Sequence, residues 1–434
     1  MRLCEAFMAW GFRVAVACAT APTKCNGHAA GLERRGITVH HLPLNSASAS
    51  SSVLQEVEPS VVVFDRFYME EAHSFRVRAL RPSVLRILDM QDSHAWRLSR
   101  QRAVERGADI EEAVRALPNA EDASLAREIS AIQRSDLTFV CSPVEERWLR
   151  DVCAVAPHKL ALAPLFAGAQ APPSDDRLDP ARFADRGGFV SLGTFRHRPN
   201  MDACNFLVRE IWPQIRAALP DAQLDLLGSH PTPVANALHS SAEGVNVIGH
   251  VTPSQLARRL TGARALLAPL RFGAGLKGKV VEAWAHGTPV VTTPIGAEGM
   301  TSVATTPIVS KGSTSEPECE RGGQWGGLWT ATTAASFAAD AVRMHSDAAL
   351  WGTCARRGAD LRLALFDERP LLHRLHEAVE RALDSCRERR ANDFVGAALW
   401  HHRSRSTEFF ARWLEAKAVI EQQGGLARSS PVDT

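Results

Sequence analysis

The chain has 434 residues, enough for two domains of ordinary size. Its 50 lysines and arginines against 48 acidic residues leave a net charge of +2, which gives no argument for nucleic acid as a partner. No stretch reaches the roughly 18–20 apolar residues that span a bilayer, and nine cysteines without a Cys-x-x-Cys pair indicate free thiols and no zinc site. Because Glu5 and Arg13 also make the start a poor signal peptide, we expect a cytoplasmic protein.

The first part of the chain predicts alternating helices and short strands. Residues 1–10 have a helical pattern that ends at Gly11. Strands are predicted at residues 13–19, 37–42, 61–65, 85–90 and 137–141, with helical stretches between them. This alternation is typical of parallel α/β architecture, and we assign residues 1–165 to one N-terminal domain.

A change of composition follows, because residues 166–187 are rich in proline, aspartate and glycine, which predicts an interdomain linker. Residues 188–370 then repeat the alternation, with strands predicted at 188–193, 223–228, 245–248, 263–268 and 290–292. Residues 301–327 have the composition of an irregular insertion, and residues 371–434 predict C-terminal helices that end in a frayed tail from Gly424. The sequence therefore predicts two doubly wound, Rossmann-like α/β domains with a helical extension and ligands in the cleft at the strand ends.

A glycine-rich loop, Gly273-Ala-Gly-Leu-Lys-Gly-Lys279, lies between the strand at 263–268 and a helix predicted from about Leu276 to His286. Its glycines allow the backbone to approach a ligand closely. Free N–H groups at a helix N-terminus favour an anion, and Lys277 and Lys279 add full positive charges. The loop therefore predicts a phosphate site, with Glu282 further along the helix. The alternative is an ordinary turn with solvated lysines.

The loop, the Glu-Ala that follows it and Gly287-Thr-Pro-Val-Val291 resemble the donor-binding signature of retaining GT-B glycosyltransferases, group 1, family 4. The resemblance implies a glycosyltransferase (EC 2.4) that moves a sugar from a nucleotide diphosphate-sugar to an unknown sugar, lipid or protein acceptor, with retention of configuration. It also implies a GT-B-like fold with two domains facing across a cleft. The nucleotide-sugar is a co-substrate, and no metal cofactor is expected because no Asp-x-Asp pair is evident.

The resemblance assigns the donor-binding residues. The backbone around Gly273, Gly275 and Leu276 and the amine of Lys277 would contact the diphosphate, while Glu282 would accept hydrogen bonds from the ribose. Three further residues complete the predicted donor-binding set: Arg196, His250 and Glu298.

These three differ in what they are expected to do. Arg196, in the loop after Gly193, is the best candidate for a second phosphate contact, with Arg198 next. His250 follows a strand near which the family binds the base. Glu298 would either contact the ligand or hold its own loop.

In the first domain, Asp92 and His94 follow the strand at 85–90 and, with Lys277, form the predicted catalytic group. Related enzymes often carry His-Asp there, whereas this chain has Gln91 at the histidine position. Helix capping by Asp92 is the alternative. The arginines at positions 97, 100, 102 and 106 predict a solvated basic helix face, which raises peripheral membrane contact as a further expectation.

Two departures from the family favour a second interpretation. Ala274 stands where the family has a sugar-contacting glutamate, and the chain opens on a helix, so that the first strand and its loop are expected to be missing. The alternative function is therefore a catalytically impaired GT-B-fold nucleotide-binding protein. A dinucleotide-dependent oxidoreductase is disfavoured, because the acidic residue expected at a later strand end is absent.

Overall fold

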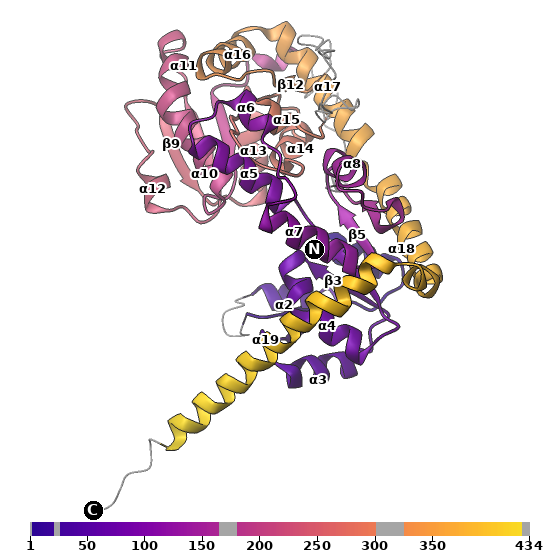
Figure 1. Ribbon diagram of the computed structural model, residues 1–434. Helices are drawn as coiled ribbons and strands as arrows, with labels where there is room; N and C mark the ends of the chain where they lie inside the picture. The colour runs from indigo at the N-terminus through magenta and orange to yellow at the C-terminus, as the bar shows by residue number, and fades with distance from the viewer. Residues whose placement is uncertain (1, 21–26, 165–179, 301–324, 428–434) are drawn as a thin grey trace, which may run out of the picture.

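The computed structural model describes residues 2–20, 27–164, 180–300 and 325–427. Within these residues, two lobes are built around three parallel sheets (Figure 1). Most of the predicted linker and nearly all of the predicted insertion lie outside the described residues.

The C-terminal lobe contains a six-stranded sheet in the described chain, with the order β12-β11-β10-β7-β8-β9. Its strands are β7 (Phe189–Leu192), β8 (Leu224–Leu227), β9 (Val245–Gly249), β10 (Ala265–Ala268), β11 (Val290–Thr292) and β12 (Gly327–Leu328). The first five confirm the predicted strands, and β12 was missed because it lies at the end of a segment predicted to be irregular. The order reverses between β7 and β10, so the loops after these two strands are where ligands bind in such sheets.

Helices cover both faces of this sheet. They are α10 (Arg198–Phe206), a π-helical turn (Leu207–Ile211), α11 (Trp212–Ala218), α12 (Pro233–Asn236), α13 (Pro253–Gly262), α14 (Gly278–Ala285), α15 (Pro294–Ala297), α16 (Ala334–Ser346) and α17 (Ala348–Phe366). Trp212 and Trp351 are fully buried in the core under one face, and Trp284 is fully buried under the other. Burial of these large apolar side chains fixes the sheet that carries the two loops.

The N-terminal lobe has two separate sheets in its described residues, β1-β2 and β3-β4-β5-β6. The strands are β1 (Ala15–Cys18), β2 (Thr38–His41), β3 (Val61–Asp65), β4 (Leu85–Asp89), β5 (Leu137–Val140) and β6 (Leu160–Leu162). The helices are α1 (Arg2–Ala9), α2 (His28–Glu33), α3 (Ala47–Val57), α4 (Phe67–Leu80), α5 (His94–Glu105), α6 (Ile110–Arg115), α7 (Ala123–Arg134) and α8 (Pro143–Asp151). The predicted strands are found, and the three-residue β6 was missed.

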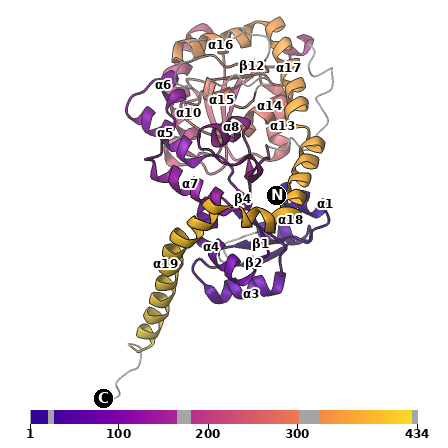
Figure 2. The same ribbon diagram turned by 45° about the vertical axis from the view of Figure 1, so that its right-hand side comes forward.

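The last two helices return to the N-terminal lobe. The apolar side of α18 (Glu368–Ala391) packs Leu375 and Val379 into the cluster that contains Leu85, Ile87 and Phe139. Helix α19 (Phe394–Ala427) then crosses α4 and α7 and projects away from the body (Figure 2). The frayed tail predicted from Gly424 is wrong at its start, since the helix continues to Ala427, and the rest lies outside the described residues.

Helices α5 and α6 lie against the C-terminal lobe, although they follow β4 of the N-terminal one (Figure 1). Ile110 of α6 belongs to the core cluster of the C-terminal lobe, and Ala113 packs with Leu270 and Ile295. The two lobes therefore share one packed segment. Among the described helices, none has both the length and the apolar character to cross a bilayer.

Candidate functional site at the lobe interface

The glycine-rich loop follows β10, at the point where the strand order reverses. Gly273 and Gly275 have φ angles of 154° and 65°, which side chains rarely adopt. The loop after β7 is equally tight, because a Cβ on Gly193 would lie 2.6 Å from the side chain of Asn200. The two predicted donor loops therefore lie side by side at the switch point of the sheet.

The glycine-rich loop presses against the N-terminal lobe. A Cβ on Gly275 would lie 2.8 Å from Cβ of Asp92 and 3.2 Å from Sγ of Cys141. The structure thus brings together Asp92 and Gly275, which are more than 180 residues apart in the sequence. Their roles in catalysis and donor binding remain predictions.

The N–H of Gly275 already has a partner. It donates to Oε1 of Glu145 at 2.8 Å, and the same oxygen accepts from the N–H of Ser93 at 3.1 Å. Oε2 of Glu145 is buried and has no hydrogen-bond partner within the described residues. Burial, together with the charge of Asp92, raises the pKa of Glu145 to about 8. The carboxyl group of Glu145, from the opposite lobe, therefore accepts the hydrogen bond of a backbone N–H that the sequence predicted to contact a phosphate.

The two lysines of the loop differ in their surroundings. Nζ of Lys277 donates to the carbonyls of Ala274 and Gly275, and burial lowers the pKa of this amine. Nζ of Lys279 donates to Oδ1 of Asn200 at 2.8 Å, and burial lowers its pKa to about 8. Lys279 therefore links α14 to the loop after β7, while Lys277 is turned into its own loop. The sequence did not separate these two roles.

Asp92 and His94 belong to a charged cluster at the end of β4. Asp92 pairs with Arg97 and, at 3.5 Å, with Arg66. Burial by itself would raise the pKa of Asp92, but the charges of Arg97 and Arg66 outweigh this effect and lower the pKa below its ordinary value. Burial, followed by the charge of Arg97, lowers the pKa of His197, which belongs to the loop after β7 and lies near this cluster.

The protonation state of His94, and the ring nitrogen that carries its proton, follow from burial and from the contact with Arg66. Burial and the charge of Arg97 lower its pKa to about 4, so the imidazole is neutral near pH 7. Arg66 contacts Nε2 of His94, and a guanidinium can only donate hydrogen bonds. Nε2 is therefore the acceptor and Nδ1 carries the proton, so His94 can donate a hydrogen bond from Nδ1.

Three further predicted donor-binding residues lie around the two loops. Arg196 and His250 are exposed at the ends of β7 and β9. Glu282 is partly buried on α14, with Oε1 3.3 Å from Nε2 of His286. Leu276 is partly buried, and its N–H contributes a hydrogen bond to Cys141.

Glu298 pairs with Arg100 of α5, and both side chains are buried. The expectation of a solvated arginine face on this helix is wrong for Arg100, which is 0% exposed. Arg97 is also partly buried and forms an ion pair with Asp92, and Arg102 donates a hydrogen bond to Asp122 at 2.6 Å. Helical periodicity could not predict this, because the partner of Arg100 comes from the other lobe.

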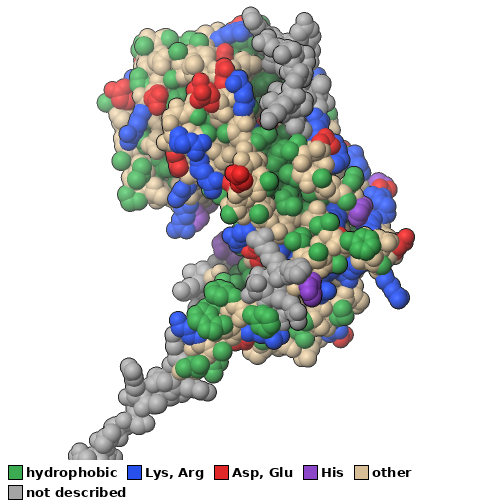
Figure 3. All heavy atoms as spheres, viewed as in Figure 1, with side chains coloured by type: hydrophobic (Ala, Val, Ile, Leu, Met, Phe, Trp, Pro, Cys, Tyr) green, Lys and Arg blue, Asp and Glu red, His purple; other side chains and the backbone are tan. Residues whose placement is uncertain are grey.

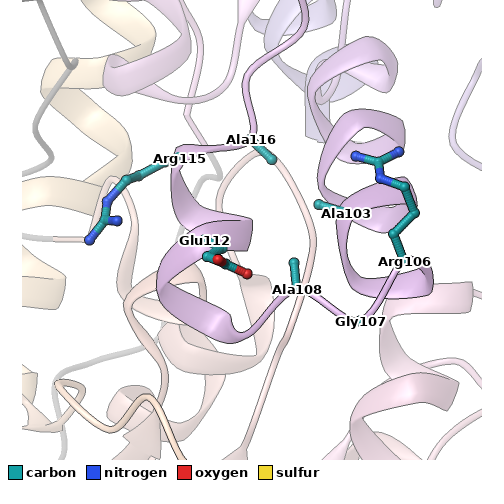
Figure 4. Close-up of a pocket in the computed structure, with 7 residues that line it drawn as sticks. All are labelled: Ala103, Arg106, Gly107, Ala108, Glu112, Arg115 and Ala116. Atoms are coloured by element: carbon teal, nitrogen blue, oxygen red, sulfur yellow. The ribbon is translucent and has the colours of Figure 1, made fainter.

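An open hollow of about 540 Å³ lies where α5 turns into α6 (Figure 4). Figure 4 shows Arg106 and Arg115 on opposite sides of it, with Glu112 between them. Its lining includes none of the predicted site residues. Within the described residues, no group of three or more His, Cys, Asp or Glu side chains is arranged to hold a metal ion.

A known protein family matches the part of the chain that carries the glycine-rich loop. Residues 186–347 match the family model described as Glycosyl transferases group 1. No curated protein matches the chain by sequence.

Three solved structures are similar along most of both chains. A sucrose-phosphate synthase from Thermosynechococcus elongatus has a TM-score of 0.60 at 17% identity and covers 88% of this chain and 92% of its own. HepE of Anabaena, in complex with UDP and glucose, has a TM-score of 0.58 at 12% identity, with 87% and 95% covered. A glycosyltransferase from Rickettsia africae has a TM-score of 0.57 at 10% identity, with 88% and 93% covered. At these identities the likeness shows the fold.

Proposed function

We propose that this chain, which has the GT-B fold and carries a group 1 glycosyltransferase domain at residues 186–347, transfers a sugar from a nucleotide diphosphate-sugar to an acceptor. The observation that best supports this is the position of the two glycine-containing loops at the switch point between β7 and β10, opposite Asp92. We further propose that the reaction retains the anomeric configuration, as in family 4.

In the proposed reaction, the bond between the anomeric carbon and the diphosphate oxygen breaks, and a bond from that carbon to an acceptor oxygen forms. Negative charge grows on the departing diphosphate, so fixed positive charge next to it lowers the barrier. We assign this charge to Lys279, Arg196 and the N-terminus of α14. We propose Lys279 as the main diphosphate contact, because the ammonium of Lys277 is held by loop carbonyls.

Asp92 and His94 would act on the sugar side of the cleft. Asp92 is held ionised by Arg97 and Arg66, so it can stabilise a positively charged sugar ring. His94 would donate a hydrogen bond from Nδ1 to a sugar hydroxyl, since its Nε2 is taken by Arg66. Glu282 would orient the nucleotide through its ribose.

The first test is nucleotide binding. We expect the protein to bind UDP, GDP or ADP, or one of their sugars, in thermal-shift and calorimetric titrations; UDP-glucose is the first probe because HepE was solved with it. Measuring release of the nucleoside diphosphate in the presence of sugar, lipid or protein acceptors in turn would then identify the acceptor class. If no nucleotide binds, both the transferase and the nucleotide-binding interpretations fail.

One observation favours the second candidate, a nucleotide-binding protein without turnover. Ala274 packs against the apolar cluster of the N-terminal lobe that includes Met90 and Val144. A sugar-contacting glutamate at this position would place a charge in apolar surroundings. Binding of a nucleotide-sugar without transfer to any acceptor would support this candidate.

For the acceptor side, we propose peripheral membrane contact through α19 instead of α5. Phe409, Trp413 and Ile420 share one face of the helix and are 59%, 55% and 67% exposed. The opposite face is marked by Glu415, which accepts a hydrogen bond from the N–H of Ala47 at 2.6 Å. Figure 3 shows hydrophobic side chains on the surface where this part leaves the body of the molecule. Aromatic side chains on an exposed helical face suit the interface of a bilayer.

Replacing Phe409 and Trp413 together with serine should reduce co-sedimentation with phosphatidylcholine–phosphatidylserine vesicles, because it removes the aromatic contacts. Phe394→Ser is the matched control, since Phe394 is 81% exposed at the other end of α19. Unchanged vesicle binding, or a change of oligomeric state instead, would contradict the membrane proposal.

A further inference from the structure

The guanidinium of Arg100 joins both lobes at the candidate site. Arg100 lies on α5, which leaves the N-terminal lobe, and its Nη1 donates to the carbonyl of Gly273 at 2.9 Å. Nη1 and Nη2 each donate to one oxygen of Glu298 at 2.8 Å, and Nη2 reaches the carbonyl of Val114 at 3.2 Å. One fully buried side chain therefore ties the glycine-rich loop, the turn after α15 and the end of α6 to each other.

The two segments of the C-terminal lobe that Arg100 ties have no room to shift. A Cβ on Gly299, next to Glu298, would lie 2.9 Å from Cδ2 of Leu276 and 3.0 Å from Oγ of Ser142. Gly273 itself has a φ of 154°. The loop conformation therefore depends on contacts made from the opposite lobe, among them the bond from Arg100 to Gly273 and the bond from Gly275 to Glu145.

Arg100 and Lys277 both interact with the charge of Glu298. Burial would raise the pKa of Glu298, but the charge and hydrogen bonds of Arg100 outweigh this and lower it, so the carboxylate is ionised. Glu298 is also the carboxylate with the largest charge effect on Lys277. Because Arg100 satisfies both oxygens of Glu298, the ammonium of Lys277 stays on the carbonyls of Ala274 and Gly275. Without Arg100, Lys277 is the cation left to neutralise Glu298.

We propose that Arg100 is a positioning residue of the donor site, which acts from the N-terminal lobe, through Gly273 and Glu298, to hold the glycine-rich loop in its diphosphate-binding conformation. The inference rests on the proposed function, since it takes this loop as the place of the donor diphosphate. In this proposal α5 and α6 move together with the C-terminal lobe, because the buried Arg100–Glu298 ion pair and the packing of Ile110 attach both helices to that lobe.

The test compares the affinities for UDP and uridine in wild type, Arg100→Met, Arg100→Lys and Arg106→Ala. Arg106 ends the same helix and is exposed, so it is the matched control. We expect Arg100→Met to weaken UDP binding at least about tenfold and uridine binding much less, since only UDP carries the phosphates. Arg100→Lys should restore part of the loss, and Arg106→Ala should bind both ligands like the wild type.

A second variant separates positioning from stability. Arg100→Met combined with Glu298→Leu removes both members of the buried ion pair, so it should fold where Arg100→Met alone fails. It loses the bond to Gly273, so UDP binding should still be weaker than in the wild type. A lower Tm with unchanged UDP affinity in the folded variants would overturn the positioning role. A wild type that binds no nucleotide diphosphate would remove the proposed function, and this inference with it.

Discussion

Alanine in place of Lys279 should weaken nucleoside diphosphate binding by roughly 10–100-fold, the value of a charged hydrogen bond, and leave nucleoside binding nearly unchanged. The reason is the position of Nζ between α14 and the loop after β7, 2.8 Å from Asn200. Calorimetric titration with the diphosphate and the nucleoside measures both values. Lys277→Ala is the comparison, and a phosphate-specific loss there but not in Lys279→Ala would reverse the two assignments.

If Lys279 contacts the diphosphate, the affinity for the diphosphate should depend on pH. The pKa of Lys279 is lowered to about 8, so the amine loses its charge as the pH rises through that value, and diphosphate affinity should fall above pH 8. Glu145 contributes in the same direction, because its carboxyl gains negative charge over the same range next to the loop. Lys279→Arg keeps its charge, so its remaining pH dependence reports the other titrating groups of the loop, Glu145 and Lys277.

The second large effect concerns stability. Asp136→Ala should lower the free energy of unfolding by about 3–5 kcal/mol, because it leaves buried Arg86 without its partner. Oδ1 and Oδ2 of Asp136 also accept from Arg390 of α18, at 2.7 Å and 2.6 Å. The variant should therefore loosen α18 from the sheet. Urea unfolding followed by circular dichroism measures the change.

The pH profile of stability provides a check on this contact. Burial would raise the pKa of Asp136, but Arg390 and Arg86 outweigh it and lower the pKa. The stability that ionised Asp136 contributes is therefore present above the unfolded-state pKa of about 3.9, and it is lost as the pH falls through the lower folded-state pKa. Asp151→Ala, at an exposed pair with Arg150, is the control and should change little. An Asp136→Ala variant as stable as this control would contradict the prediction.

Local patterns were enough to predict most of the sheets. Apolar runs such as residues 263–268 and 290–292 are short and bounded by turn residues, and they became buried parallel strands. Strands β6 and β12, of three and two residues, were missed, whereas β11, also of three residues, is marked by the Gly287-Thr-Pro289 turn before it. The glycine spacing likewise predicted the loop before α14, because positive φ angles and close approach require glycine.

Contacts across the lobes could not be predicted in the same way. Arg100 lies on a helix whose arginines have the spacing of a solvated face, and only the tertiary structure brings Glu298 to it. Nothing in the sequence around Glu145 indicates that it would reach the N–H of Gly275. Both residues are ionisable and buried, and such residues need a partner that pattern alone does not reveal.

The return of α18 has a consequence for the order in which the protein can form during synthesis. The strands of the N-terminal lobe are made first, but the apolar side of α18 that covers Leu85 and Phe139 is made more than 200 residues later. The C-terminal lobe has its described strands and helices within residues 180–366, so it can form in one continuous stretch. The lobe that begins the chain is therefore the last to be completed, and until then one face of its sheet has only the partial cover of α1, through Phe7.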